Sequence, residues 1–113
     1  MAMDQQMNFS AILAQVMRDE TQYQPLGGPE VVSACDQQTG QYLLIAAGWQ
    51  KERHINHILF HARLLDGLVV IETDNTEEGL KAELIEAGVP ASQIVFGAQY
   101  KPATAEAAEA MVA

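Results

Sequence analysis

The sequence has 113 residues, of which 49% are hydrophobic and 19% charged. This predicts one small domain over residues 1–113, with a core that needs neither a disulfide nor a structural metal. Fifteen Asp and Glu against six Lys and Arg give a net charge of −9. The average surface therefore repels nucleic acid and anionic lipid, and the chain alone is not expected to bind nucleic acid directly. A single cysteine, no signal peptide and no apolar run of the roughly 20 residues of a membrane helix predict a cytoplasmic protein.

The amino-terminal part is predicted to form an amphipathic helix. From Asn8, a suitable N-cap, apolar residues recur at helical spacing on one face as far as Met17. We expect this helix to run to about Gln22. The following segment, 25–29, contains two prolines and two glycines and is predicted to be a loop.

Four strands are predicted in succession after this loop. They are Glu30–Asp36, Gln41–Trp49, His54–Leu64 and Leu68–Glu72. The dipeptide Asp66-Gly67 predicts a tight hairpin, because both residues tolerate a positive φ. Consecutive strands joined by short turns indicate a mainly antiparallel sheet.

A second helix is predicted from residues 74–76, each of which is a competent N-cap, with two glutamates in its first turn. Gly88-Val89-Pro90 ends it near residue 87. A short strand follows at Gln93–Phe96, and the tail, 103–113, is expected to be helical or frayed. The predicted fold is α+β, with a mainly antiparallel sheet of about five strands and two helices packed on it.

No motif of an enzyme active site is present in the sequence. It has no phosphate-binding glycine loop, no nucleophile elbow and no zinc-protease motif. Cys35 lacks a basic cluster that would lower its pKa, and is interpreted as a small buried residue in a strand. Trp49 is interpreted by default as a core aromatic residue, with an interface anchor as the alternative. The sequence thus predicts a non-enzymatic protein without a cofactor.

The three histidines, His54, His57 and His61, lie within one short stretch. In a strand, His57 and His61 share a face but lie about 13 Å apart, at roughly 3.3 Å per residue. That distance is too long for one ion, so no metal site is predicted. The alternative is a small metal-binding enzyme, since a helix would bring these two histidines together.

Charge is distributed unevenly along the chain. Residues 51–63 carry a net charge of +2, whereas residues 72–86 carry a net charge of −5. A surface rich in carboxylates attracts a basic partner and speeds association with it, although an acidic helix face is also a common soluble surface.

A set of residues with fixed spacing runs from Tyr42 to Tyr100. Its members are Gly48-Trp49, Arg53, His61, Asp66-Gly67, Ile71, Asp74, Thr76-Glu77, Gly79, Glu83-Leu84, Gly88-Val89-Pro90 and Ile94-Val95. In this combination the sequence resembles the XisI family, the excision controlling factors of the fdxN DNA element, which is widespread in filamentous cyanobacteria. The resemblance departs after Gly97, where the family carries an arginine and an aromatic segment that this chain lacks.

The resemblance implies an accessory role in site-specific excision together with an XisH-type partner, a protein that itself resembles a nuclease. Catalysis of recombination then belongs to other proteins. The residues that the resemblance puts forward for partner binding are Trp49, Arg53, His61, Asp74, Glu77 and Glu83. Alternatively, Arg53 and His61 form a structural network of hydrogen bonds or ion pairs with Asp74.

The hypothesis from sequence is therefore a regulatory protein that binds a basic XisH-type protein through an acidic surface. The runner-up is a recombination directionality factor that contacts DNA through the strand between Lys51 and Arg63. A homo-oligomer is a further expectation, because a five-stranded sheet with only two helices leaves an edge or a face to be covered.

Overall fold

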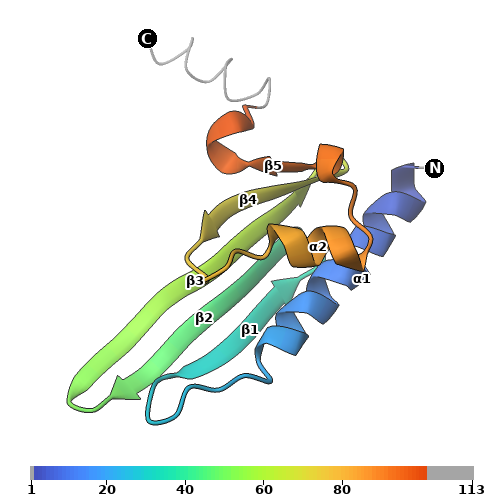
Figure 1. The fold of residues 1–113 in the computed structure, drawn as a ribbon. Helices are drawn as coiled ribbons and strands as arrows, with labels where there is room; N and C mark the ends of the chain where they lie inside the picture. The colour runs from blue at the N-terminus through green and yellow to red at the C-terminus, as the bar shows by residue number, and fades with distance from the viewer. Residues whose placement is uncertain (1, 102–113) are drawn as a thin grey trace, which may run out of the picture.

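The computed structural model describes the backbone of residues 2–101 and the side chains of residues 8–101. Two helices lie on one face of a five-stranded sheet (Figure 1). In chain order the α-helices and strands are α1 (Ala2–Glu20), β1 (Glu30–Asp36), β2 (Gln41–Gln50), β3 (Arg53–Leu65), β4 (Leu68–Asp74), α2 (Lys81–Ala87) and β5 (Ile94–Phe96). The predicted α+β fold is confirmed.

The strands lie in the sheet in the order in which they occur in the chain. The first four pair antiparallel, and β5 pairs parallel with β4 after the crossover through α2. The predicted hairpin at Asp66-Gly67 is confirmed, with φ of 53° and 76° at its two residues. Such paired positive φ values match the right-handed twist of the strands that the turn joins.

The core lies between the sheet and the two helices. Alternate residues of β2 and β3, such as Tyr42 and Phe60, are fully buried there because side chains alternate between the two faces of a strand. Leu13 of α1 and Leu84 of α2 are buried in the same cluster. The Tyr42 hydroxyl forms a hydrogen bond of 2.5 Å with the Ser10 hydroxyl, which ties β2 to α1.

The predicted bounds of the second helix are wrong, because α2 begins at Lys81 rather than at residues 74–76. The segment before it folds back onto Asp74, whose carboxylate accepts hydrogen bonds from the backbone N–H groups of Thr76 and Leu80. Gly79 has a φ of 79°, which also interrupts a right-handed helix. Residues 75–80 therefore form a loop, and Glu77 lies in this loop instead of in a helical first turn.

Two burial predictions are also wrong. Trp49 is 60% exposed, because it lies seven positions after the buried Tyr42 on β2 and therefore points to the face of the sheet opposite the helices. It lies near the end of β2, where β2 and β3 form a hairpin that projects from the rest of the molecule (Figure 1). Cys35 is exposed because β1 is an edge strand. The predicted tail, 103–113, lies outside the described residues. Within the described residues, no helix is both long enough and apolar enough to span a membrane.

Candidate partner-binding site

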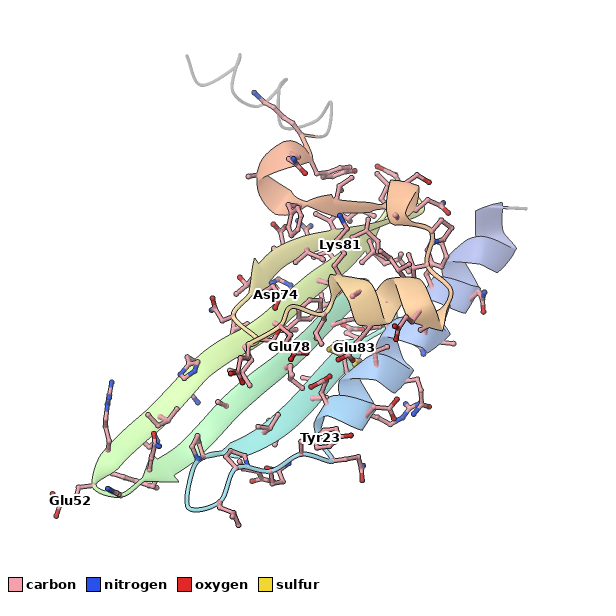
Figure 2. All side chains as sticks on the ribbon, viewed as in Figure 1. Tyr23, Glu52, Asp74, Glu78, Lys81 and Glu83 are labelled. Atoms are coloured by element: carbon pink, nitrogen blue, oxygen red, sulfur yellow. The ribbon has the colours of Figure 1, made fainter. Side chains whose placement is uncertain are left out.

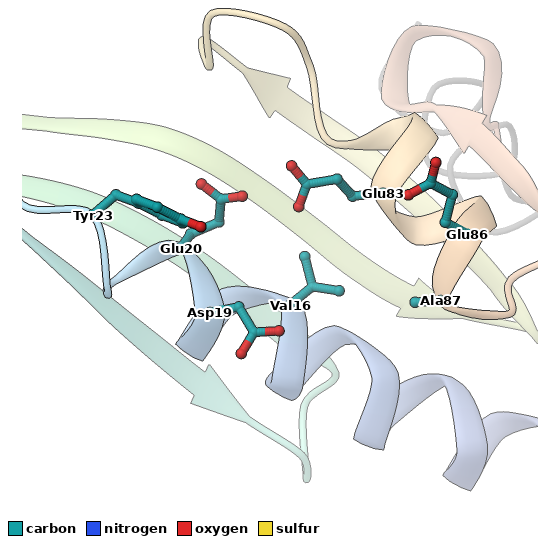
Figure 3. A pocket seen from close by; sticks show the side chains of 7 residues that line it. All are labelled: Val16, Asp19, Glu20, Tyr23, Glu83, Glu86 and Ala87. Carbon is teal, nitrogen blue, oxygen red and sulfur yellow. The ribbon is translucent and has the colours of Figure 1, made fainter.

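An acidic cleft lies between the carboxyl-terminal end of α1 and the helix α2 (Figure 3). Its volume is about 500 Å³. None of the residues that line it is a cation: they are Val16, Asp19, Glu20, Tyr23, Glu83, Glu86 and Ala87. We call this the α1–α2 acidic cleft.

The helical repeat explains why these carboxylates meet. On α1, Val16 is buried, and the residues three and four positions later, Asp19 and Glu20, follow it along the same side of the helix. On α2, Leu84 is buried in the core, and its exposed neighbours Glu83 and Glu86 flank it. Packing the two apolar stripes on the sheet therefore brings the adjoining acidic positions of both helices into one cleft.

The carboxyl groups of Glu20 and Glu83 point toward each other across the cleft (Figure 3). The pKa of Glu20 is raised from 4.5 to about 7, first because burial disfavours its charged form. The hydrogen bond with Glu83 and the negative charges of Glu83, Asp19 and Asp74 raise this pKa further. Glu20 therefore keeps its proton up to a pH of about 7, and its protonated carboxyl can donate a hydrogen bond to Glu83.

The two helical cations beside the cleft do not line it. Arg18, in the last turn of α1, donates to the side-chain oxygen of Gln15 at 2.8 Å. The Nζ atom of Lys81, at the start of α2, lies over the ring of Phe96 at 5.6 Å from its centroid. Among the described residues, the salt bridge in the sheet joins Arg63 to Glu72 at 3.2 Å, away from the cleft-lining set. The cleft therefore presents negative charge to solvent.

Replacing Glu83 by Gln is expected to raise the free energy of unfolding by about 1 kcal/mol at pH 8. One pKa unit corresponds to about 1.4 kcal/mol, and the partial exposure of Glu20 screens the effect. Below pH 4.5, Glu20 is protonated in both the folded and the unfolded state; between 4.5 and about 7 only the folded state keeps the proton. The stability of the wild-type protein should therefore fall as pH rises through this window.

Urea denaturation between pH 4 and pH 8 measures this effect. Glu83→Gln should flatten the pH dependence, because the amide can donate a hydrogen bond to an ionised Glu20. Glu86→Gln is the matched control, since Glu86 lines the cleft without contributing to the raised pKa of Glu20. Equal slopes for wild type and Glu83→Gln would contradict the role of Glu83 in raising the pKa of Glu20.

Two of the predicted partner-binding residues lie on the projecting β2–β3 hairpin. Trp49 is exposed, and its ring centroid lies 5.0 Å from that of His54. Arg53 is also exposed, at the first position of β3. Figure 2 shows Glu52 at the tip of this hairpin, far from Glu83 on α2. Trp49 and Arg53 are therefore not brought together with the acidic cleft.

The alternative network of Arg53, His61 and Asp74 is wrong. His61 is half-buried, and its Nε2 lies 2.7 Å from the Gln41 side-chain oxygen. The carboxylate of Asp74 instead accepts hydrogen bonds from the loop before α2, including one from the Thr76 hydroxyl. Asp74 is thus a loop-organising residue, although its charge contributes to the field at the cleft.

Among the predicted partner-binding residues, Glu83 alone lines the cleft, and Asp19 and Glu20 were missed. Both missed residues lie in the last turn of α1. Carboxylates are unfavourable there, because the helix dipole places partial negative charge at the carboxyl-terminal end. Two adjacent acidic residues in that position were the signal that could have pointed to them.

The strand assignment that separates the three histidines is confirmed by β3. Within the part of the chain that the structure describes, no group of three His, Cys, Asp or Glu side chains is placed to hold a metal ion.

Comparisons with known proteins agree on one family. The family model of the XisI protein matches residues 3–109. A crystal structure of the fdxN element excision controlling factor XisI from Anabaena variabilis is 20% identical, with a TM-score of 0.66 over 85% of this chain and 88% of that chain. A XisI-like protein from the same organism is 25% identical, with a TM-score of 0.65 over 88% and 89% of the two chains. No curated protein matches the sequence.

The family model spans nearly the whole chain, and both solved structures share the fold of this chain along most of their length. This chain belongs to the XisI family.

Proposed function

We propose that this chain is a non-enzymatic regulatory protein that controls excision of a DNA element together with an XisH-type protein, and that it binds this partner through the α1–α2 acidic cleft. The observation that carries the proposal is the convergence of four carboxylates from two helices in a cleft whose lining has no cation. Family membership supports the excision-controlling role.

The electrostatics of the cleft suit a basic partner. A Lys or Arg side chain that enters the cleft would neutralise carboxylates that now repel one another, as the raised pKa of Glu20 indicates. Binding would therefore shift Glu20 toward its ionised form and release a proton near neutral pH. A net charge of −9 adds long-range attraction for a basic protein.

Co-purification of the tagged chain with an XisH-type protein tests this proposal. We expect a complex at low salt that weakens at high salt, because opposite charges at an interface rim are screened. Glu83→Lys combined with Glu86→Lys should weaken the complex at least 10-fold, since both cleft carboxylates of α2 are reversed.

A matched control separates the cleft from net charge alone. Glu30→Lys combined with Glu52→Lys makes the same change in net charge at two exposed positions outside the cleft lining. An equal loss of binding in both double variants would contradict the cleft as the docking site. No complex at any salt concentration would contradict the partnership itself.

A second candidate function is DNA contact through the β2–β3 hairpin. The favouring observation is that Lys51 and Arg53 are exposed beside the exposed Trp49. Aromatic rings that stack on bases, next to cations that contact phosphates, are typical of nucleic-acid-binding surfaces. This candidate predicts a mobility shift of DNA that weakens steeply with salt and is lost in Arg53→Glu, whereas a flat response would rule it out.

A further inference from the structure

The free edge of β1 is protected along only part of its length. β1 forms one edge of the sheet (Figure 1). At Val31, the backbone N–H donates to the side-chain oxygen of Gln24 at 2.9 Å, and the side-chain nitrogen of Gln24 donates to the Val31 carbonyl oxygen at 2.9 Å. The amide of Gln24 therefore takes the place of a neighbouring strand at this one residue.

Further along β1 the edge is open. Because Val31 directs its N–H and C=O away from β2, and alternate residues of an antiparallel strand share that direction, Ser33 and Cys35 direct theirs outward as well. Among the described residues, no side chain or loop forms a hydrogen bond with these outward groups. Two N–H donors and two C=O acceptors are thus available for hydrogen bonds with another strand.

This open stretch lacks the usual protection of an edge strand. Natural edges are blunted by a bulge, a proline, a lysine or a covering element. β1 pairs with β2 without a register shift, and its sequence, Glu-Val-Val-Ser-Ala-Cys-Asp, contains neither proline nor lysine. The side chains from Ala34 to Asp36 are exposed.

We propose that β1 pairs antiparallel with β1 of a second copy of this chain, about a two-fold axis at Ala34. In this register Ser33 lies opposite Cys35 of the second copy, and Cys35 lies opposite Ser33 of the second copy. All the open donors and acceptors of both copies are then satisfied. The contact between Gln24 and Val31 stays intact in each copy.

The register shifted by one residue, with its axis at Ser33, is less favourable. An axis at Ser33 would place Glu30 opposite Asp36 of the second copy, and like charges directly opposite each other destabilise a strand pair. It would also require Gln24 to leave Val31. With the axis at Ala34, two alanine methyl groups face each other at the centre, and no carboxylate faces another.

Charge sets how this dimer responds to salt. Each copy carries a net charge of −9, so the two copies repel each other, and added salt should strengthen their association. The acidic cleft of the proposed function has the opposite salt dependence. The inference does not rest on that function, and either can fail without the other.

Cysteine cross-linking tests the register. In a non-hydrogen-bonded antiparallel pair the Cα atoms are about 4.5 Å apart, which is within the disulfide range of about 4.4–6.8 Å. We expect Ala34→Cys combined with Cys35→Ser to form a disulfide-linked dimer in mild oxidant. The wild-type Cys35 side chains would lie diagonally, about 7–8 Å apart, and should cross-link at least 10-fold less.

Gln37→Cys combined with Cys35→Ser is the matched control, because residue 37 is exposed in the turn just past β1. If this control or the wild type cross-links as readily as the Ala34→Cys variant, the proposed register is overturned.

Analytical ultracentrifugation of the full chain provides a second readout. We expect dimerisation to increase between 50 mM and 500 mM NaCl and to be lost in Ser33→Pro. Proline removes an outward N–H that β1 does not use for pairing with β2, and it is tolerated on edge strands. A thermal melt confirms that the variant folds. A monomer at every salt concentration, or a dimer unchanged by Ser33→Pro, would overturn the proposal.

Discussion

Replacing Asp74 by Ala is expected to lower the free energy of unfolding by about 3 kcal/mol. One carboxylate oxygen accepts the Thr76 N–H at 3.1 Å and the Thr76 hydroxyl; the other accepts the Leu80 N–H at 2.9 Å. Hydrogen bonds to a charged group contribute about 1.5–3 kcal/mol each. Water can replace part of this in a half-buried loop, so we expect less than the sum.

The Asp74→Ala substitution is expected to affect α2 as well, because it removes the hydrogen bond to Leu80, which is buried in the core directly before the helix. Urea denaturation measures the loss, and circular dichroism reports whether α2 is retained. Glu77→Ala is the matched control, because Glu77 is exposed in the same loop and its loss should change stability by less than about 0.5 kcal/mol. Equal effects of the two substitutions would contradict the loop-organising role of Asp74.

Asp74 also shows why a family pattern does not separate structural from interface residues. Its place in the pattern suggested a partner-binding residue, whereas its hydrogen bonds stay within the loop before α2. If partner binding by Asp74→Ala falls only in proportion to the unfolded fraction, the residue has a structural role alone. The same comparison can be made for His61, which forms its hydrogen bond with Gln41.

The strands could be predicted well because their signals are local. The β1 bounds, Glu30–Asp36, were predicted as observed, since a β-rich run there ends at a polar turn. The hairpin at Asp66-Gly67 was likewise predicted from two residues that tolerate positive φ. The strand and the hairpin depend on residues that are close together in the chain, so their signals can be found in a single sequence.

Features that depend on tertiary contacts were not predictable in the same way. The start of α2 was misplaced because three consecutive N-cap residues are present, and only the hydrogen bond from Leu80 to Asp74 shows that the chain forms a loop first. The burial of Trp49 was misjudged because it depends on which face of the sheet the two helices cover, and Trp49 lies on the other face. The acidic cleft joins residues about 60 positions apart, a proximity that follows only from the packing of two helices.

Replacing Gly40 by Ala is expected to lower the free energy of unfolding by about 3 kcal/mol. Gly40 ends the β1–β2 turn with a φ of 69°, a left-handed conformation that costs a residue with a Cβ atom about 1 kcal/mol. A Cβ atom there would lie 2.8 Å from the Leu64 carbonyl oxygen, closer than van der Waals contact allows. The backbone cannot simply withdraw, because the Gly40 carbonyl accepts the Leu64 N–H at 2.8 Å. Overpacking of this kind costs a further 1–3 kcal/mol.

Gly67→Ala is the matched control for this substitution. Gly67 also has a positive φ, of 76°, but nothing lies within 4 Å of a Cβ atom placed on it. Its substitution should therefore cost the backbone strain alone, about 1 kcal/mol. Urea denaturation of both variants separates the two effects: a difference of about 2 kcal/mol measures the close approach of β2 to the end of β3. Equal losses would show that Leu64 moves aside and that backbone strain accounts for the whole effect.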